Sequence, residues 1–339
     1  MKEPNLSPLR PKTVPRLLAA TLLCGALACA ALLAQNLNND TTIRANVHLV
    51  LVPVTVTDAK GKFVDGLKAE DFVLYDDGVP QRQLQVDTSD TVLAPIALVV
   101  AIQASWISQP ALEKIHKIGG MLQPLVAGER GEIAVLSYDA EVRTVQDFTR
   151  DSSKISGAFE SIEGRTIKSG KMLDAVMDGV KMLEKTPESY RRMMLIIGES
   201  RDRGSKAKLD QAIEAVQRAS VTMYPLTYSA QTTAWTARPE DDPSLPIDPD
   251  YAGGIVEALR LTTRNAADEF AKWTGGRHLS FTRLEGLQEA IQRLSAEVHS
   301  QYLLSFQPQE TGNKGLHRLI VQVRGHKGAQ IRARPDYWP

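Results

Sequence analysis

Residues 95–110 of this chain read PIALVVAIQASWISQP, and residues 193–204 read MMLIIGESRDRG. Each is a continuous apolar run that breaks abruptly into polar residues. Such a run indicates a strand that is buried on both faces and ends at the carboxyl edge of a parallel sheet. Because ligands bind beyond the carboxyl ends of such strands, we expect a functional site in the turns that follow Ile102 and Ile197.

The segment between Pro95 and His299 alternates strand patterns with helix patterns. This alternation predicts βαβ units, and therefore an α/β domain whose mostly parallel, Rossmann-like sheet is covered by helices on both faces. The strands expected after the first are 132–138, 193–197, 221–228 and 277–281, and the expected helices are 110–125, 172–183, 206–219, 256–273 and 284–298.

Both ends of the chain carry short strand patterns instead, and Asp76-Asp77-Gly78 is a hairpin signal. Neither end has enough strands to bury a core alone. We therefore predict one small antiparallel β domain, built from 43–92 and completed by 300–339, with an α/β domain over 93–299 inserted between them. The expected strands are 47–58, 72–75 and 81–86 at the front, and 301–306, 318–323 and 330–334 at the end.

Residues 1–34 have the pattern of an export signal: basic residues precede an apolar run, and Ala28-Cys29-Ala30 offers a cleavage site. The alternatives are a retained membrane anchor and a lipid-modified Cys29, although Ala26 stands where a lipoprotein signal usually has Leu, Val or Ile. Both cysteines, Cys24 and Cys29, lie in this segment, so the mature protein is expected to have no disulfide. We predict an exported protein that is periplasmic, secreted or associated with the cell envelope, and that meets a membrane only through an uncleaved or lipidated N-terminus.

Five phrases from the two ends of the chain carry a family resemblance. They are VPVTVTDAKGKFVDGL (52–67), EDFVLYDDGVPQ (70–81), SQYLLSFQP (300–308), HRLIVQVRG (317–325) and IRARPDYW (331–338). In this order they resemble the exported A-domain-related proteins that are abundant in acidobacteria. The turns that follow Ile102 and Ile197 also resemble the metal-site loops of the von Willebrand factor A fold, whose first loop reads Asp-x-Ser-x-Ser. This resemblance implies a von Willebrand factor A-type domain in a secreted or surface-tethered protein without an assigned biochemical role.

The metal site that the resemblance implies is degenerate in this chain. Gln103 stands in place of the first Asp, Ile107 in place of the second Ser, and Glu199 in place of the later Asp. In the middle loop Gly170 occupies the Thr register, and Ser169 is the nearest hydroxyl. A hard dication is normally held by more than one carboxylate. We therefore expect no metal cofactor, with Mg²⁺ on Ser105 and Glu199 as the alternative, and we expect Lys171 to neutralise Glu199.

Trp106 and Ile107 follow the first strand, and they are candidate contacts for an unknown protein partner at the carboxyl edge of the sheet. The alternative is that they pack beneath a neighbouring loop. Residues 230–254 form a long acidic loop without a spaced D-x-D-x-D-G pattern, and a solvated loop is favoured there over a Ca²⁺ site.

Enzyme motifs are missing from the sequence. The six histidines show no H-E-x-x-H spacing, and there is no G-x-S-x-G and no G-x-x-x-x-G-K-[ST]. The 40 basic and 40 acidic residues balance, which gives no reason to expect a nucleic-acid partner. The favoured function is an exported, non-enzymatic protein–protein interaction module with a metal-free site. The alternatives are a Mg²⁺-dependent adhesion protein of the same fold and a subunit of a cell-envelope enzyme.

Overall fold

The computed structural model describes residues 49–88, 94–105, 109–165, 167, 169–228, 265–281, 284–308 and 315–338. All of them belong to one compact unit, His48–Pro339. The predicted export signal, Trp106, Ile107 and the 230–254 loop lie outside the described residues. No helix in the part that the structure describes is long and apolar enough to cross a membrane.

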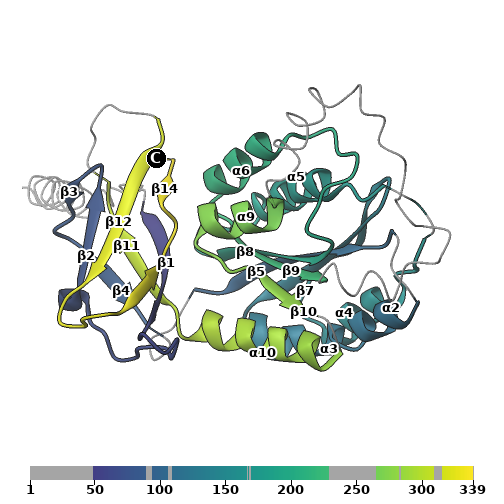
Figure 1. Cartoon of the computed structure of the whole chain (residues 1–339), viewed down its shortest axis with the longest axis horizontal. Coiled ribbons are helices and arrows are strands. Elements are labelled where there is room, and N and C mark those ends of the chain that lie inside the picture. Colours follow the sequence, from purple (N-terminus) through teal and green to yellow (C-terminus); the bar gives the residue numbers. More distant parts are fainter. Residues whose placement is uncertain are drawn as a thin grey trace, which may run out of the picture. The chain divides into compact units, whose positions relative to one another are not determined.

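The central sheet has six strands in the order β10-β9-β8-β5-β6-β7 (Figure 1). All neighbouring pairs are parallel except β6 and β7, which are antiparallel. The chain runs outward from β5 in one direction and from β8 in the other, so the two central strands form the switch point of a doubly wound sheet. The strands are β5 (Ile96–Gln103), β6 (Glu132–Tyr138), β7 (Val142–Thr149), β8 (Arg191–Gly198), β9 (Thr222–Tyr228) and β10 (Leu279–Phe281).

Helices cover both faces of this sheet, as the sequence predicts (Figure 1). Alternate residues of β5 point to opposite faces: Leu98 and Val100 pack among helices α2, α3, α4 and α10, and Val99 packs among α5, α6 and α9. Every residue of β5 is buried, which explains its uninterrupted apolar run. The helices are α2 (Gln109–His116), α3 (Gly119–Leu122), α4 (Ser152–Glu160), α5 (Met172–Leu183), α6 (Leu209–Arg218), α9 (Ala266–Thr274) and α10 (Leu284–His299), with a π-helical turn at Gln123–Ala127.

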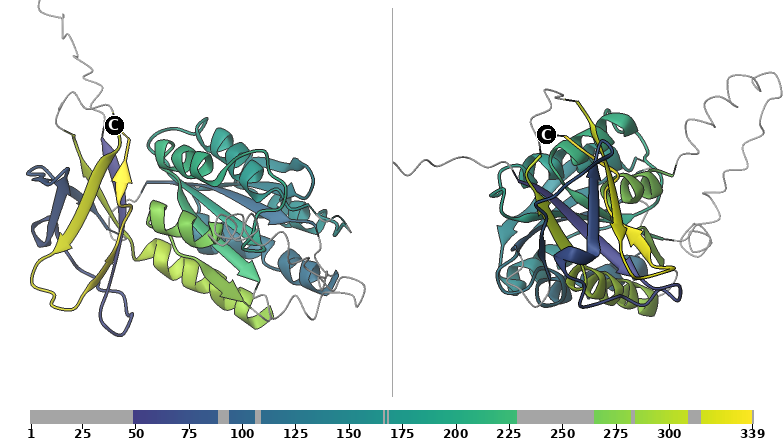
Figure 2. Two further views of the ribbon diagram at one scale, coloured as in Figure 1. Left: turned by 45° about the horizontal axis from the view of Figure 1, so that its top comes forward. Right: turned by 90° about the vertical axis from the view of Figure 1, so that its left-hand side faces the viewer.

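The two ends of the chain build a second unit of two antiparallel sheets, β13-β1-β11-β4 and β14-β12-β2-β3. Strands from the front of the chain, in purple and blue, lie beside strands from its end, in yellow (Figure 2). The small antiparallel β domain predicted from both ends is thereby confirmed. Its strands are β1 (Val50–Thr57), β2 (Phe72–Asp76), β3 (Val79–Pro80), β4 (Gln85–Asp87), β11 (Tyr302–Phe306), β12 (His317–Val323), β13 (Gln330–Arg332) and β14 (Asp336–Tyr337), with a 3₁₀ turn at Ala69–Asp71.

Buried polar groups join this β unit to the α/β part. Gln301 accepts a hydrogen bond from Arg191 at 2.5 Å and donates to the Tyr224 hydroxyl at 2.8 Å. Glu297, near the end of α10, pairs with Arg277 at 2.8 Å and also with Arg332 of β13. Because a carboxylate as deeply buried as Glu297 is stabilised by pairing, its contacts hold β13 against the end of α10.

The structure corrects three expectations for single elements. Strand β7 and helix α4 are present but not predicted from the sequence. Their apolar patterns are weak, because β7 is at most half-buried along its length and α4 buries only three residues. The helix expected over 110–125 is interrupted at residues 117 and 118, and α3 begins at Gly119, where an added Cβ would lie 2.8 Å from the Phe159 ring. The return strand expected over 81–86 is found only at its end, in β4, while β3 comes before it and belongs to a different sheet. The turn at Asp77-Gly78 has the positive φ angles, 47° and 82°, of a type I′ hairpin.

Deletion of residues 300–339 tests the shared β unit. The deletion removes both neighbours of β1 and leaves β2 paired only with the two-residue strand β3, so the front strands cannot bury their apolar face. Limited proteolysis should then cut within 49–88 under conditions that leave the intact chain resistant. A truncated chain that kept its protection over this segment would contradict the shared-unit fold.

Candidate functional site at the carboxyl edge of the sheet

The switch point brings most of the predicted site residues together. Gln103 ends β5, and Glu199 follows β8 directly. The backbone of Ser105 bridges to Arg165, and that of Gly170 bridges to Arg203, so the three loops meet at this edge. Ser169 also lies here, since its Oγ donates to the carbonyl of Arg203 at 2.9 Å.

The side-chain amide of Gln103 links the ends of the two central strands. It is 3% exposed. Its Nε2 donates to Ser105 Oγ at 3.2 Å and to the Ser105 carbonyl at 3.3 Å, and its Oε1 accepts from the backbone N–H of Glu199 at 2.7 Å. A buried amide needs both donors and acceptors. These contacts provide both, so Gln103 replaces a carboxylate here without leaving an unsatisfied group.

Two glycines leave room for this amide. A Cβ at Gly170 would lie 3.2 Å from both Gln103 Nε2 and Ser105 Oγ. A Cβ at Gly198 would lie 2.6 Å from Gln103 Oε1 and 2.3 Å from the Tyr138 hydroxyl. A side chain at position 170 would therefore crowd the Gln103 amide, so glycine at 170 suits glutamine at 103.

Glu199 is neutralised by Arg203 and not by Lys171. Arg203 Nη2 lies 3.0 Å from Glu199 Oε2, with the side chains 44% and 15% exposed. The expected partner, Lys171, is instead the N-cap residue of α5. Its backbone N–H donates to the carbonyl of Asp139. Two backbone hydrogen bonds of 3.0 Å between Gly170 and Arg203 hold the loop after β8 at the edge. They place Arg203, rather than the predicted Lys171, beside Glu199.

A second carboxylate at this edge, Asp139, is not predicted from the sequence. It is fully buried, receives two hydrogen bonds from Arg143 at 3.0 and 3.1 Å, and lies 3.7 Å from Arg165. Burial alone would raise the pKa of Asp139, but the hydrogen bonds from Arg143 and from the backbone N–H of Glu141, with the charges of both arginines, lower it below its usual value. The available signal was an Asp directly after a buried strand, with an Arg four residues later.

The donor set at this edge does not fit Mg²⁺. The ion needs several oxygen ligands in a near-octahedral array, with carboxylates to balance its charge. Here Ser105 Oγ accepts from the Gln103 amide, Glu199 pairs with Arg203, and Asp139 holds two arginines. Gly170 has no side chain. Amide and guanidinium N–H groups are thus directed at the oxygens that a metal would need.

A different cluster, Asp76, Asp77 and His317 in the β unit, has ligand atoms close enough to share an ion. His317 Nδ1 lies 3.1 Å from Asp76 Oδ1 and 3.2 Å from Asp77 Oδ2. The Tyr337 hydroxyl donates to Asp76 at 2.8 Å, and the backbone N–H of Arg318 donates to Asp77 at 2.8 Å. Protein donors therefore satisfy these carboxylates, and the cluster joins the Asp77-Gly78 hairpin to β12 and β14.

His278 lies in a row of side chains that resembles a catalytic relay. Its Nε2 is 2.6 Å from Thr227 Oγ1, and its Nδ1 is 2.6 Å from Asp268 Oδ1. A nucleophile, however, has to reach its substrate. Thr227 is only 3% exposed. The row therefore ties β9 to α9, and it supplies no open hydroxyl.

Comparisons with known proteins give similar folds. No family model matches the sequence, and no curated protein matches it either. The chain is similar to the conserved hypothetical protein BatB from Bacteroides thetaiotaomicron, at 16% identity over 60% of this chain and 98% of that one, with a TM-score of 0.41. It is similar to the vWF domain of the type V pili tip protein Mfa5 from Porphyromonas gingivalis, at 10% identity over 61% and 95%, with a TM-score of 0.40. It is also similar to a von Willebrand factor type A structure from Catenulispora acidiphila, at 10% identity over 87% and 75%, with a TM-score of 0.46.

These solved structures include von Willebrand factor A domains, the class of domain that the sequence resembles. The likeness concerns fold alone, and at such identities what those proteins bind is not carried over to this chain. The narrower resemblance to exported acidobacterial proteins remains a prediction.

A double-mutant cycle tests the Glu199–Arg203 pair. Arg203→Ala should lower the free energy of unfolding by about 0.5–1 kcal/mol, because it leaves a mostly buried carboxylate unpaired while the half-exposed arginine is screened by water. Glu199→Gln combined with Arg203→Ala should recover part of that loss in urea unfolding.

Lys171→Ala is the matched control and should cost less than Arg203→Ala. If Lys171→Ala proved the more costly change and coupled to Glu199→Gln, the assignment of Arg203 as the partner would be wrong.

Proposed function

We propose that this chain is an exported, non-enzymatic protein–protein interaction module whose site at the carboxyl edge works without a divalent metal. The observation that carries the proposal is the Gln103 amide, which bonds to Ser105 and to the Glu199 backbone where the resemblance places a metal carboxylate. A site satisfied by protein groups alone needs no ion to be ordered.

The charges at the edge support binding that does not use a metal. Arg203 and Arg165 are each about half exposed, and each lies beside a carboxylate that is much more buried. Arginine at a rim presents several N–H donors and recognises carboxylates without an ion. We therefore propose that the partner offers an acidic group to this rim, next to the apolar contacts proposed at Trp106 and Ile107.

The non-enzymatic part of the proposal rests on the described polar clusters. Thr227 is a hydroxyl within hydrogen-bonding distance of an imidazole that also meets a carboxylate, and it is buried. Asp139 is held by two arginines with a lowered pKa, which makes it a poor general base near neutral pH. Both clusters are better suited to holding loops than to moving protons.

Capture of partners from a cell-envelope extract tests the proposed function. The immobilised protein should retain the same partner in the presence of a chelator as with added Mg²⁺, because no ion holds the site. Trp106→Ala should reduce the yield, while Leu316→Ala, which removes an exposed apolar side chain of the β unit, should not. Loss of the partner in chelator, with recovery on addition of Mg²⁺, would instead support the metal-dependent alternative.

Export is tested by N-terminal sequencing of protein recovered outside the cytoplasm. The predicted mature chain starts near Ala31, after the Ala28-Cys29-Ala30 pattern. An intact Met1 on membrane-bound protein would show a retained anchor, and a lipid on Cys29 would show a lipoprotein.

A further inference from the structure

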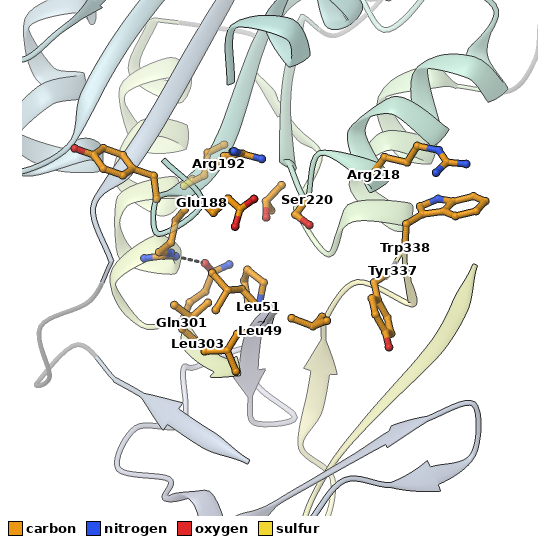
Figure 3. Close-up of a pocket in the computed structure, with 16 residues that line it drawn as sticks. Leu49, Leu51, Glu188, Arg192, Arg218, Ser220, Gln301, Leu303, Tyr337 and Trp338 are labelled. Carbon is orange, nitrogen blue, oxygen red and sulfur yellow. Dashed lines mark hydrogen bonds between the residues drawn. The ribbon is translucent and has the colours of Figure 1, made fainter. Parts of the chain in front are cut away.

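A cavity of about 250 Å³ lies at the amino end of β8, far along that strand from the carboxyl edge. Figure 3 shows Arg192, Glu188 and Ser220 along one side of it, and Leu49, Leu51 and Leu303 along the facing side. The first group comes from the α/β part and the leucines come from the β unit. The cavity therefore has one polar wall and one apolar wall.

Among the residues that the structure describes, no carboxylate pairs with two of the arginines that line this cavity. Arg191 is buried, and its Nη atoms donate only to the Val298 carbonyl at 3.4 Å and to Gln301 Oε1 at 2.5 Å. Its Nε is buried without a hydrogen-bond partner. Burial lowers the pKa of Arg191, as it does for a cation that has no counter-ion.

The neighbouring Arg192 is likewise bonded only to neutral oxygens. It donates to Thr186 Oγ1 at 3.4 Å, to the Thr186 carbonyl at 2.9 Å and to the Ala219 carbonyl at 3.3 Å. A guanidinium has five N–H donors. Within the described residues these three bonds leave two donors, and neither Arg191 nor Arg192 forms an ion pair. A third arginine, Arg218, already pairs with Glu214 and lies 3.6 Å from the Trp338 ring centroid.

The net charge of the side chains on the polar wall indicates what charge a ligand of this cavity should carry. Arg191 and Arg192 carry two positive charges, and Glu188, the one carboxylate among the described residues that line the cavity, offsets one of them. One positive charge is left, which a monoanion balances. Ser220 adds a hydroxyl to the same wall, and its φ of 55° is rare for a residue other than glycine. The leucines opposite favour a ligand with an apolar body.

We infer that this cavity binds a small amphiphilic carboxylate, with its charged head at Arg192 and Ser220 and its apolar body against Leu49, Leu51 and Leu303. The carboxylate accepts hydrogen bonds from the free guanidinium N–H groups, and it offsets the cost of burying Arg191 without a counter-ion. The inference does not depend on the proposed function, because it concerns the opposite end of β8.

The test is calorimetric titration of the purified full-length protein with hexanoate. Hexan-1-ol, which keeps the tail, and inorganic phosphate, which keeps only the charge, serve as comparison ligands. Hexanoate should bind more tightly than both. Arg192→Gln should weaken its binding by about tenfold, the value of one charge-assisted hydrogen bond. Arg293→Gln, which removes an exposed arginine of α10, is the matched control and should change nothing.

Two further variants keep the test valid if Arg192→Gln unfolds the protein. Glu188→Gln alters an exposed side chain and should strengthen hexanoate binding, because it removes a repelling charge. Leu49→Ala should weaken it, because it removes part of the apolar wall. The inference is overturned if hexanoate binds no better than hexan-1-ol, or if Glu188→Gln and Leu49→Ala both leave its affinity unchanged.

Discussion

The side-chain amide of Gln103 determines how the carboxyl edge of this sheet is built. Strands β5 and β8 pair side by side up to Ile102 and Ile197, and the Gln103 amide links the two chain segments just beyond that last pair. The amide joins them because it donates on one side, to Ser105, and accepts on the other, from the Glu199 N–H. A carboxylate at the same position has no donor for Ser105, and without an added cation it brings a second negative charge close to Glu199.

Other features of the edge follow from that one side chain. Gly170 and Gly198 are needed because a Cβ at either position crowds the amide. Because Gln103 is uncharged, Glu199 has no carboxylate at that position beside it, and Arg203 from its own loop supplies its cation. At the opposite end of β8 the charges are not paired. Arg191 and Arg192 begin the strand, and no described carboxylate forms an ion pair with either of them. One strand therefore carries a neutralised site at its carboxyl end and an unneutralised one at its amino end.

The sequence predicts the buried parts of this fold well and its edges less well. Strand β6 and helix α5 coincide with their predicted bounds, 132–138 and 172–183, because burial on one or both faces leaves a clear apolar period. Strand β7 has no such period, since as an edge strand it is only half-buried. The place of the short strands β3 and β4 in two different sheets depends on their pairing with β2 and β11, which no local sequence pattern indicates.

In the site, too, features that depend on nearby sequence could be predicted, and features that depend on contacts between distant segments could not. The positions of Gln103, Ser105, Gly170 and Glu199 could be predicted, because each follows a strand or precedes a helix at the edge. The partner of Glu199 could not, because Arg203 is held by backbone bonds to Gly170, over thirty residues earlier in the chain. The cavity could not be predicted either, because its walls come from the start of β8 and from the β unit, which are far apart in the sequence.

The most direct test of the central claim is calorimetric titration of the protein with Mg²⁺, Mn²⁺ and Ca²⁺. If the Gln103 amide and Arg203 take the place of the ion, the titrations should show no saturable binding at micromolar metal. Stoichiometric binding in that range, lost in Glu199→Ala, would contradict the account and show that the edge is a metal site after all.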